Sequence, residues 1–140
     1  MDDLVKWLRE QIAEDRSAAL LATAGPWRHN PEKHWRKPGT VWCEEAVFAG
    51  AAGADAMCIA GTGNSDDPQS TADARHIARH DPRAVLTQCD AHEAILNECV
   101  RVRENHFSDD FTADHLAELV VRQLALAYQH HPGYREEWRP

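Results

Sequence analysis

The sequence predicts an α+β fold in which a small antiparallel sheet of about three strands is covered by about four helices. Apolar residues recur at helical spacing at the start of the chain and over its second half. Between these regions, short apolar runs are separated by Gly- and Pro-containing segments, a pattern typical of short strands. Because 140 residues with 43% hydrophobic content suffice for one core, we expect residues 1–140 to form a single domain.

The first helix is expected from Asp2 to about Ala22, ending before Gly25-Pro26. Asp2 and Asp3 place negative charge at its N-terminus, where the helix dipole favours carboxylates. Its core-facing stripe is expected to contain five apolar residues: Leu4, Val5, Leu8, Ile12 and Ala19.

The three expected strands are Trp27–His29, Val47–Ala49 and Met57–Ala60. Loops are expected from Asn30 to Gly39 and from Gly61 to Pro68, both rich in polar and turn-forming residues. A sheet this small needs a helix against one face to be stable.

Two helix starts are predicted in the middle of the chain. Ser70 is expected to cap a helix running to His80, with Asp73 completing a capping box. Asp81 is expected to cap the next helix, with Pro82 at its first position. The buried face of that helix should contain Val85, Leu86, Cys89, His92, Leu96, Cys99 and Val100.

The last helix is expected to start near Thr112 and to end at Pro132-Gly133. His130 and His131 suit its negative end. Its core-facing stripe is predicted to be Leu116, Leu119, Val120, Leu124 and Ala127. In the tail that follows, Tyr134 and Trp138 are expected to dock on the body of the protein.

The formal net charge of −8 argues against direct nucleic-acid binding, which relies on Lys and Arg to neutralise phosphates. It fits a protein that docks on a basic partner surface. No apolar run is as long as a membrane span, and the start Met-Asp-Asp lacks the features of a signal peptide. We therefore expect a cytoplasmic protein whose four cysteines, Cys43, Cys58, Cys89 and Cys99, are reduced.

Five segments together carry a resemblance to a known family: Ala24–Trp27, Glu45–Gly50, Asp66–Ser70, Ala72–Pro82 and His131–Trp138. With these motifs the chain resembles an uncharacterised family of small proteins of actinobacteria and their phages, domain of unknown function 6221. The resemblance covers nearly the whole chain and implies no known chemistry. It suggests a mobile-element origin.

Asp73, His76 and His80 share one face of the predicted helix and form the candidate metal site. Two imidazoles and a carboxylate at this spacing suit zinc, iron or nickel. A zinc hydrolase would need a Glu beside the first His, where this chain has Ile77. The alternative is that Asp73 caps the helix, His76 packs under a Trp and His80 lies at the helix end; we expect no stoichiometric metal.

Cys89 and His92 are three residues apart and could share a metal ion, but Cys99 would lie ~15 Å along the same helix. A buried Cys acting as a small apolar residue explains the pattern better.

The segment from Trp27 to Trp42 gathers aromatic and basic residues within an acidic chain. Trp and Arg are typical anchors of protein interfaces. The binding residues predicted here are Trp27, His29, Trp35, Arg36 and Trp42. In the competing interpretation the tryptophans cover the sheet and the cations belong to a solvated loop.

These observations favour a non-enzymatic accessory protein of phage or prophage type that binds a protein partner and needs no cofactor. An inhibitor of a host defence protein is one form of this hypothesis. The alternative is a metal-dependent enzyme or sensor, with zinc or iron held by the Asp/His/His site. The sequence indicates neither the identity of the partner nor the oligomeric state.

Overall fold

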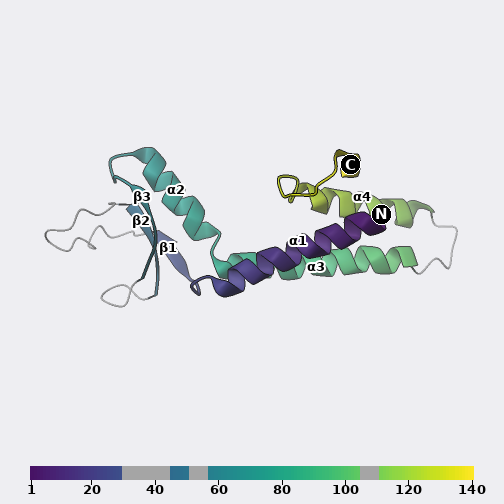
Figure 1. Ribbon diagram of the computed structural model, residues 1–140, viewed down its shortest axis with the longest axis horizontal. Helices are drawn as coiled ribbons and strands as arrows, with labels where there is room; N and C mark the ends of the chain where they lie inside the picture. Colours follow the sequence, from purple (N-terminus) through teal and green to yellow (C-terminus); the bar gives the residue numbers. More distant parts are fainter. Residues whose placement is uncertain (30–44, 51–56, 105–110) are drawn as a thin grey trace. The chain divides into compact units, whose positions relative to one another are not determined.

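The computed structural model describes residues 1–29, 45–50, 57–104 and 111–140, and it confirms the α+β fold (Figure 1). In chain order the elements are α1 (Asp2–Leu21), β1 (Trp27–His29), β2 (Glu45–Ala49), β3 (Met57–Gly63), α2 (Pro68–Arg79), α3 (Pro82–Glu104), α4 (Phe111–Leu126) and a 3-10 turn (Glu136–Trp138). Within the described ranges, no helix is both long and apolar enough to cross a membrane.

The chain divides into two compact units. Unit 1 contains residues 1–17 and 87–140, and unit 2 contains residues 18–86. The expectation of a single domain stays a prediction.

In unit 2 the three strands form one antiparallel sheet in the order β1-β2-β3. Trp27 pairs with Ala49 and His29 with Val47, while Phe48 of β2 pairs with Cys58 of β3. All three predicted strands are confirmed, but β3 continues to Gly63 and so takes up the first part of the predicted loop Gly61–Pro68. Register shifts in the β2–β3 ladder accommodate this longer strand.

The helix α2 packs against all three strands. It begins at Pro68, and its N-cap is Asp67, not Ser70 as predicted. Asp67 accepts a hydrogen bond from the backbone N–H of Gln69 at 3.0 Å, and the predicted capping box does not form. The physical reason is that Pro68 suits the first helical position, since it has no N–H to satisfy there.

Ser70 instead lies buried on α2, facing the end of β3. Its hydroxyl donates to Asp67 at 3.0 Å, and its carbonyl accepts from the hydroxyl of Thr62 at 2.7 Å. Gly63 has a φ of +134°, and any side chain there would collide with Ser70. The close approach of strand and helix therefore depends on a glycine at this position.

The second predicted cap is confirmed at Asp81, immediately before α3. Its carboxylate accepts from the backbone N–H groups of Ala84 at 2.9 Å and of Trp27 at 3.2 Å. The pKa of Asp81 is lowered because these hydrogen bonds and Arg83 outweigh the effect of its burial. One buried carboxylate thus fixes both the start of α3 and the start of β1.

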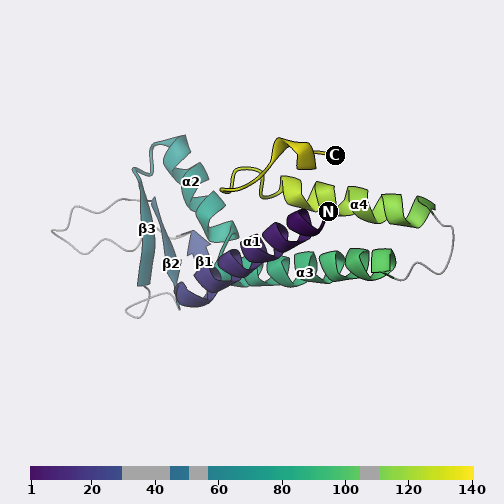
Figure 2. The ribbon, with the colours of Figure 1, turned by 45° about the vertical axis from the view of Figure 1, so that its right-hand side comes forward.

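In unit 1, α1, α3 and α4 run alongside one another, as the two views show (Figures 1 and 2). The predicted stripe of α1 is confirmed, since Leu4, Leu8, Ile12 and Ala19 are buried and Val5 is half-buried. On α3, Cys89, Leu96 and Cys99 are buried as predicted.

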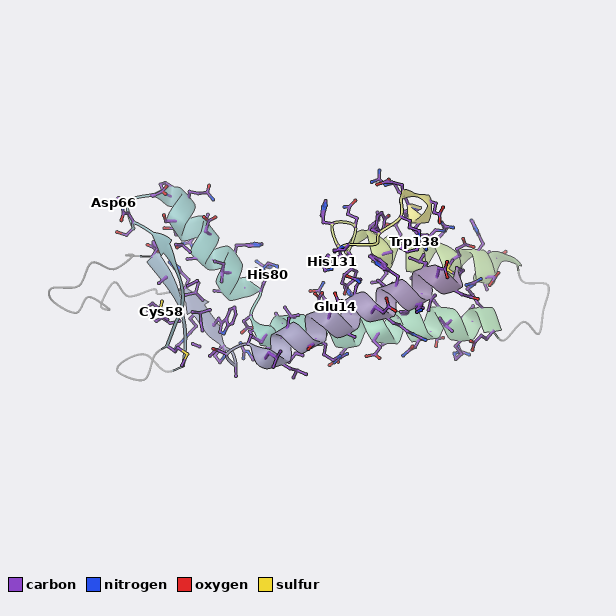
Figure 3. All side chains as sticks on the ribbon, viewed as in Figure 1. Glu14, Cys58, Asp66, His80, His131 and Trp138 are labelled. Atoms are coloured by element: carbon purple, nitrogen blue, oxygen red, sulfur yellow. The ribbon has the colours of Figure 1, made fainter. Side chains whose placement is uncertain are left out.

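The chain after α4 docks on α1, as predicted for Tyr134 and Trp138 (Figure 3). The ring of Trp7 lies 5.7 Å from that of Tyr134 and 5.2 Å from that of Trp138. The indole N–H of Trp7 donates to the carbonyl of Pro132 at 3.0 Å. The helix itself ends at Leu126, six residues before the predicted stop at Pro132, and residues 127–133 form turns.

Three of the four cysteines, Cys58, Cys89 and Cys99, lie in the described ranges. Cys89 and Cys99 are buried, and burial raises the pKa of both thiols. Cys58 is exposed on β3, and Cys43 lies outside the described residues.

The corrected cap of α2 gives a stability prediction. Changing Asp67→Ala should lower the free energy of unfolding by about 1 kcal/mol, because the N–H of Gln69 loses its acceptor. Asp66→Ala is the matched control, and as an exposed neighbour it should change stability by less than about 0.5 kcal/mol. Urea denaturation of both variants makes the comparison, and an equal loss in both would contradict the assignment of the cap.

Candidate functional site

The helix α4 buries its small residues and exposes its large ones. Ala117, Val121 and Ala125 are buried, with exposed fractions of 6%, 1% and 0%. They are spaced four residues apart and so form one ridge along the helix. Leu116 and Leu119 are 60% and 36% exposed.

The predicted core stripe of α4 is therefore wrong. None of its five members is buried: Leu116, Leu119 and Ala127 are exposed, and Val120 and Leu124 are half-buried. Two stripes of this helix have apolar residues at helical spacing, and periodicity alone does not tell which one packs inside. The Ala/Val ridge packs inside because small side chains let a helix come close to its neighbours.

Four residues of α4 define what we call the outer face: Leu116, Leu119, Gln123 and Leu126. The first three are exposed and Leu126 is half-buried. Of the charged residues of α4, Glu118 and Arg122 border this face and Asp114 lies on the side of the ridge, and all three have partners within unit 1. Glu118 pairs with Arg122 at 2.8 Å, and Asp114 pairs with Arg103 at 3.4 Å. The outer face is thus an uncharged, largely apolar strip on an otherwise acidic protein.

Polar contacts at the end of α4 hold this orientation. Tyr128 is buried, and its hydroxyl shares a hydrogen bond of 2.9 Å with Nδ1 of His92 on α3. The ring of Tyr128 meets that of His131 edge to face at 5.4 Å. Nδ1 of His131 in turn donates to the buried side chain of Gln11 on α1 at 2.9 Å. Figure 3 shows His131 in the turn that follows α4.

Two groups of this cluster, Tyr128 and His92, have pKa values shifted toward their uncharged forms. Burial raises the pKa of Tyr128 to about 12, and the nearby charges of Asp15 and Cys89 act in the same direction. Burial lowers the pKa of His92, against the opposing effect of Asp15. Since the pKa of the Cys89 thiol is also raised, the reactive thiolate is disfavoured. These groups suit packing and orientation better than nucleophilic chemistry.

The predicted binding segment from Trp27 to Trp42 is described only at its start. The indole N–H of Trp27 donates to the carbonyl of Thr23 at 2.8 Å, and Nε2 of His29 hydrogen-bonds the carboxylate of the buried Glu45. Both side chains are therefore engaged within unit 2. Trp35, Arg36 and Trp42 lie outside the described residues.

The candidate metal residues are only partly brought together. The rings of His76 and His80 lie 4.4 Å apart, and both residues are exposed near the end of α2. Figure 3 labels His80 there. Nδ1 of His80 bonds to the carbonyl of His76 at 2.8 Å, while Asp73 accepts from the Gln69 side chain at 2.7 Å. Asp73 does not cap the helix and His76 is not buried under a Trp, so both of those expectations are wrong.

Among the residues that the structure describes, no group of three or more His, Cys, Asp or Glu side chains is placed to hold a metal ion. Within these ranges no third candidate ligand joins the Cys89 and His92 pair, and Nδ1 of His92 bonds to Tyr128. His80 does lie at the helix end, as expected.

A groove of about 660 Å³ lies between α1 and α3 in unit 1. It is lined by Asp2, Val5, Lys6, Arg9, Glu10, Ala13, Val100, Arg103 and Glu104. Three of these residues are cationic and three are acidic, so the charges of the lining cancel. Such a groove selects neither an anionic nor a cationic ligand.

The chain matches the model of a known protein family. A family of unknown function, DUF6221, matches residues 1–140. The chain belongs to this family. No curated protein and no solved structure matches the chain. Because the family has no assigned function, the assignment of a candidate site rests on the geometry of this chain's own residues.

The contact between His92 and Tyr128 gives a pH prediction. The pKa of His92 is lowered on folding, so its contribution to stability is complete above its ordinary pKa of about 6.5. That contribution is lost as the pH falls through the folded-state pKa, because the unfolded chain binds the proton more readily.

We expect His92→Gln to reduce the slope with which the free energy of unfolding falls between pH 7 and pH 5. Gln88→Ala, at an exposed position of α3 whose side chain cannot titrate, is the control and should leave that slope unchanged. Urea denaturation over the pH series measures both. A slope that is the same in His92→Gln and in the wild type would contradict the lowered pKa of His92 in the folded protein.

Proposed function

We propose that this protein is a non-enzymatic binding protein that contacts another protein through the outer face of α4. The observation that supports the proposal is the exposure of Leu116 and Leu119, which lie one turn apart on the same side of the helix. An apolar strip bordered by polar surface is typical of interaction sites, and a helix with anchors at this spacing suits recognition by another helix or a groove.

The distribution of charge supports a protein partner over a nucleic acid. Unit 1 contains 15 Asp and Glu against 8 Lys and Arg, a formal charge of −7. Unit 2 contains 8 against 7, a formal charge of −1. The unit that contains α4 would thus repel phosphates.

The family resemblance extends the proposal to an accessory protein of phage or prophage type, acting in the cytoplasm of actinobacteria or of cells infected by their phages. An inhibitor of a host defence protein is one form of that role. The alternative of a metal-dependent enzyme or sensor would need three ligands held together, and among the described residues no such group of His, Cys, Asp or Glu side chains is present.

A double substitution that places negative charge on the outer face tests the proposal. Leu116→Glu combined with Leu119→Glu should reduce partner capture about 100-fold, since each leucine contributes roughly 1.5 kcal/mol or more when buried. The fold should be retained because both positions are exposed and Glu is a good helix former. Leu20→Glu with Leu21→Glu is the matched control, because these leucines are 67% and 86% exposed at the end of α1.

Capture is measured by co-purification from the native host with quantitative mass spectrometry, and folding by thermal melting. We expect a partner that is retained by the wild type and by the α1 control and lost from the α4 variant at unchanged melting temperature. Equal capture by both variants, or loss only in the α1 control, would refute binding through the outer face.

A further inference from the structure

We propose that the outer face of α4 binds the same face of a second copy of this chain, as an antiparallel helix pair about a two-fold axis. This inference rests on the proposed function, because it names the partner of the same surface. It would make the protein a reversible homodimer joined through unit 1.

The spacing of the outer face is that of a helix–helix seam. Leu116, Leu119, Gln123 and Leu126 follow one another at intervals of three, four and three residues, the a and d positions of a heptad pattern. In an antiparallel pair, a positions of one helix pack against d positions of the other. With the axis at residue 121, Leu116 faces Leu126 of the second copy and Leu119 faces Gln123 of the second copy.

The same surface patch therefore serves both copies, which is the requirement of a closed two-fold interface. Four layers form, with leucine on both sides in the two outer layers and leucine against glutamine in the two inner layers. A polar residue within a seam costs stability but fixes the register of the helices. Gln123 would serve this purpose here.

The charges on and beside the outer face favour a second copy over a basic protein as the partner. The outer face has no charged side chain, and Glu118, the acid that borders it, is already paired with Arg122. A basic surface would find nothing to pair with there. A second copy meets an uncharged strip like its own. Arg122 borders the strip next to the axis, so the Arg122 side chains of the two copies approach one another, but each is already paired with Glu118 of its own chain.

Salt gives the pairing a distinctive signature. Each copy has a formal charge of −8, so the two copies repel one another at long range, and this repulsion is screened as the ionic strength rises. Dimer formation should strengthen with added salt. Docking of the acidic chain on a basic partner would weaken under the same change.

Sedimentation velocity tests the inference on the full-length protein. A seam of four layers is smaller than a standard protein interface, so we expect mainly monomer at about 1 μM and mainly dimer at about 500 μM. The shift toward dimer should be greater at high than at low salt. A monomer throughout the series overturns the second copy as partner, whereas the proposed function stands or falls on its own capture experiment.

Variants then locate the interface. Leu116→Glu with Leu119→Glu should weaken the dimer at least 100-fold, and Leu20→Glu with Leu21→Glu should leave it unchanged. Gln123→Leu should tighten it about tenfold, a gain that a folding defect does not produce. A dimer that is unaffected by the α4 changes, or one that Gln123→Leu weakens, would overturn the proposed seam.

Discussion

The rotation of α4 about its own axis decides which side chains this protein presents, and the contacts of its small-residue ridge fix that rotation. Ala117, Val121 and Ala125 are almost completely buried. At the end of the ridge, Tyr128 continues the same face and bonds to His92. Turning the helix to bury Leu116 and Leu119 would place larger side chains where only Ala and Val fit, and would break the hydrogen bond of Tyr128.

The tail adds a second restraint on the same rotation. His131 bonds to Gln11, and the carbonyl of Pro132 accepts from Trp7, so the chain leaving α4 is tied to α1 at two adjacent residues. Gly133 adopts a φ of +85° beside the ring of Trp7, where a side chain would be strained. The sequence near the C-terminus thus helps determine which face of a preceding helix meets solvent.

Much of the fold could be predicted because the signals were local. Asp81-Pro82 marks a helix start by its own chemistry, and Leu4, Leu8 and Ile12 form the only strong apolar stripe of α1. Asp67-Pro68 carries the same signal as Asp81-Pro82, but Ser70 and Asp73 offered a competing capping box. The structure favours the cap that precedes proline, and Ser70 is buried against Thr62 of a strand, a long-range contact that no local pattern reveals.

The candidate site could not be predicted because it depends on a choice between two stripes of one helix. A leucine side chain gains more free energy on burial than an alanine side chain, so the sequence pattern favours burial of Leu116 and Leu119. What reverses that choice is packing against α1 and α3, which lie far away along the chain. Leu116 and Leu119 are exposed although the sequence pattern predicts their burial. The proposed binding surface and the proposed dimer both depend on this exposure.

Thiol labelling tests the rotation of α4 most directly. Single cysteines at Leu116→Cys and Ala117→Cys, in a chain lacking Cys43 and Cys58, would be treated with a maleimide at low protein concentration and followed by mass spectrometry. Neighbouring positions of 60% and 6% exposure should differ strongly, with Leu116→Cys modified far faster than Ala117→Cys. Equal rates, or faster modification of Ala117→Cys in the folded protein, would show that α4 presents a different face and would contradict the outer face as a binding surface.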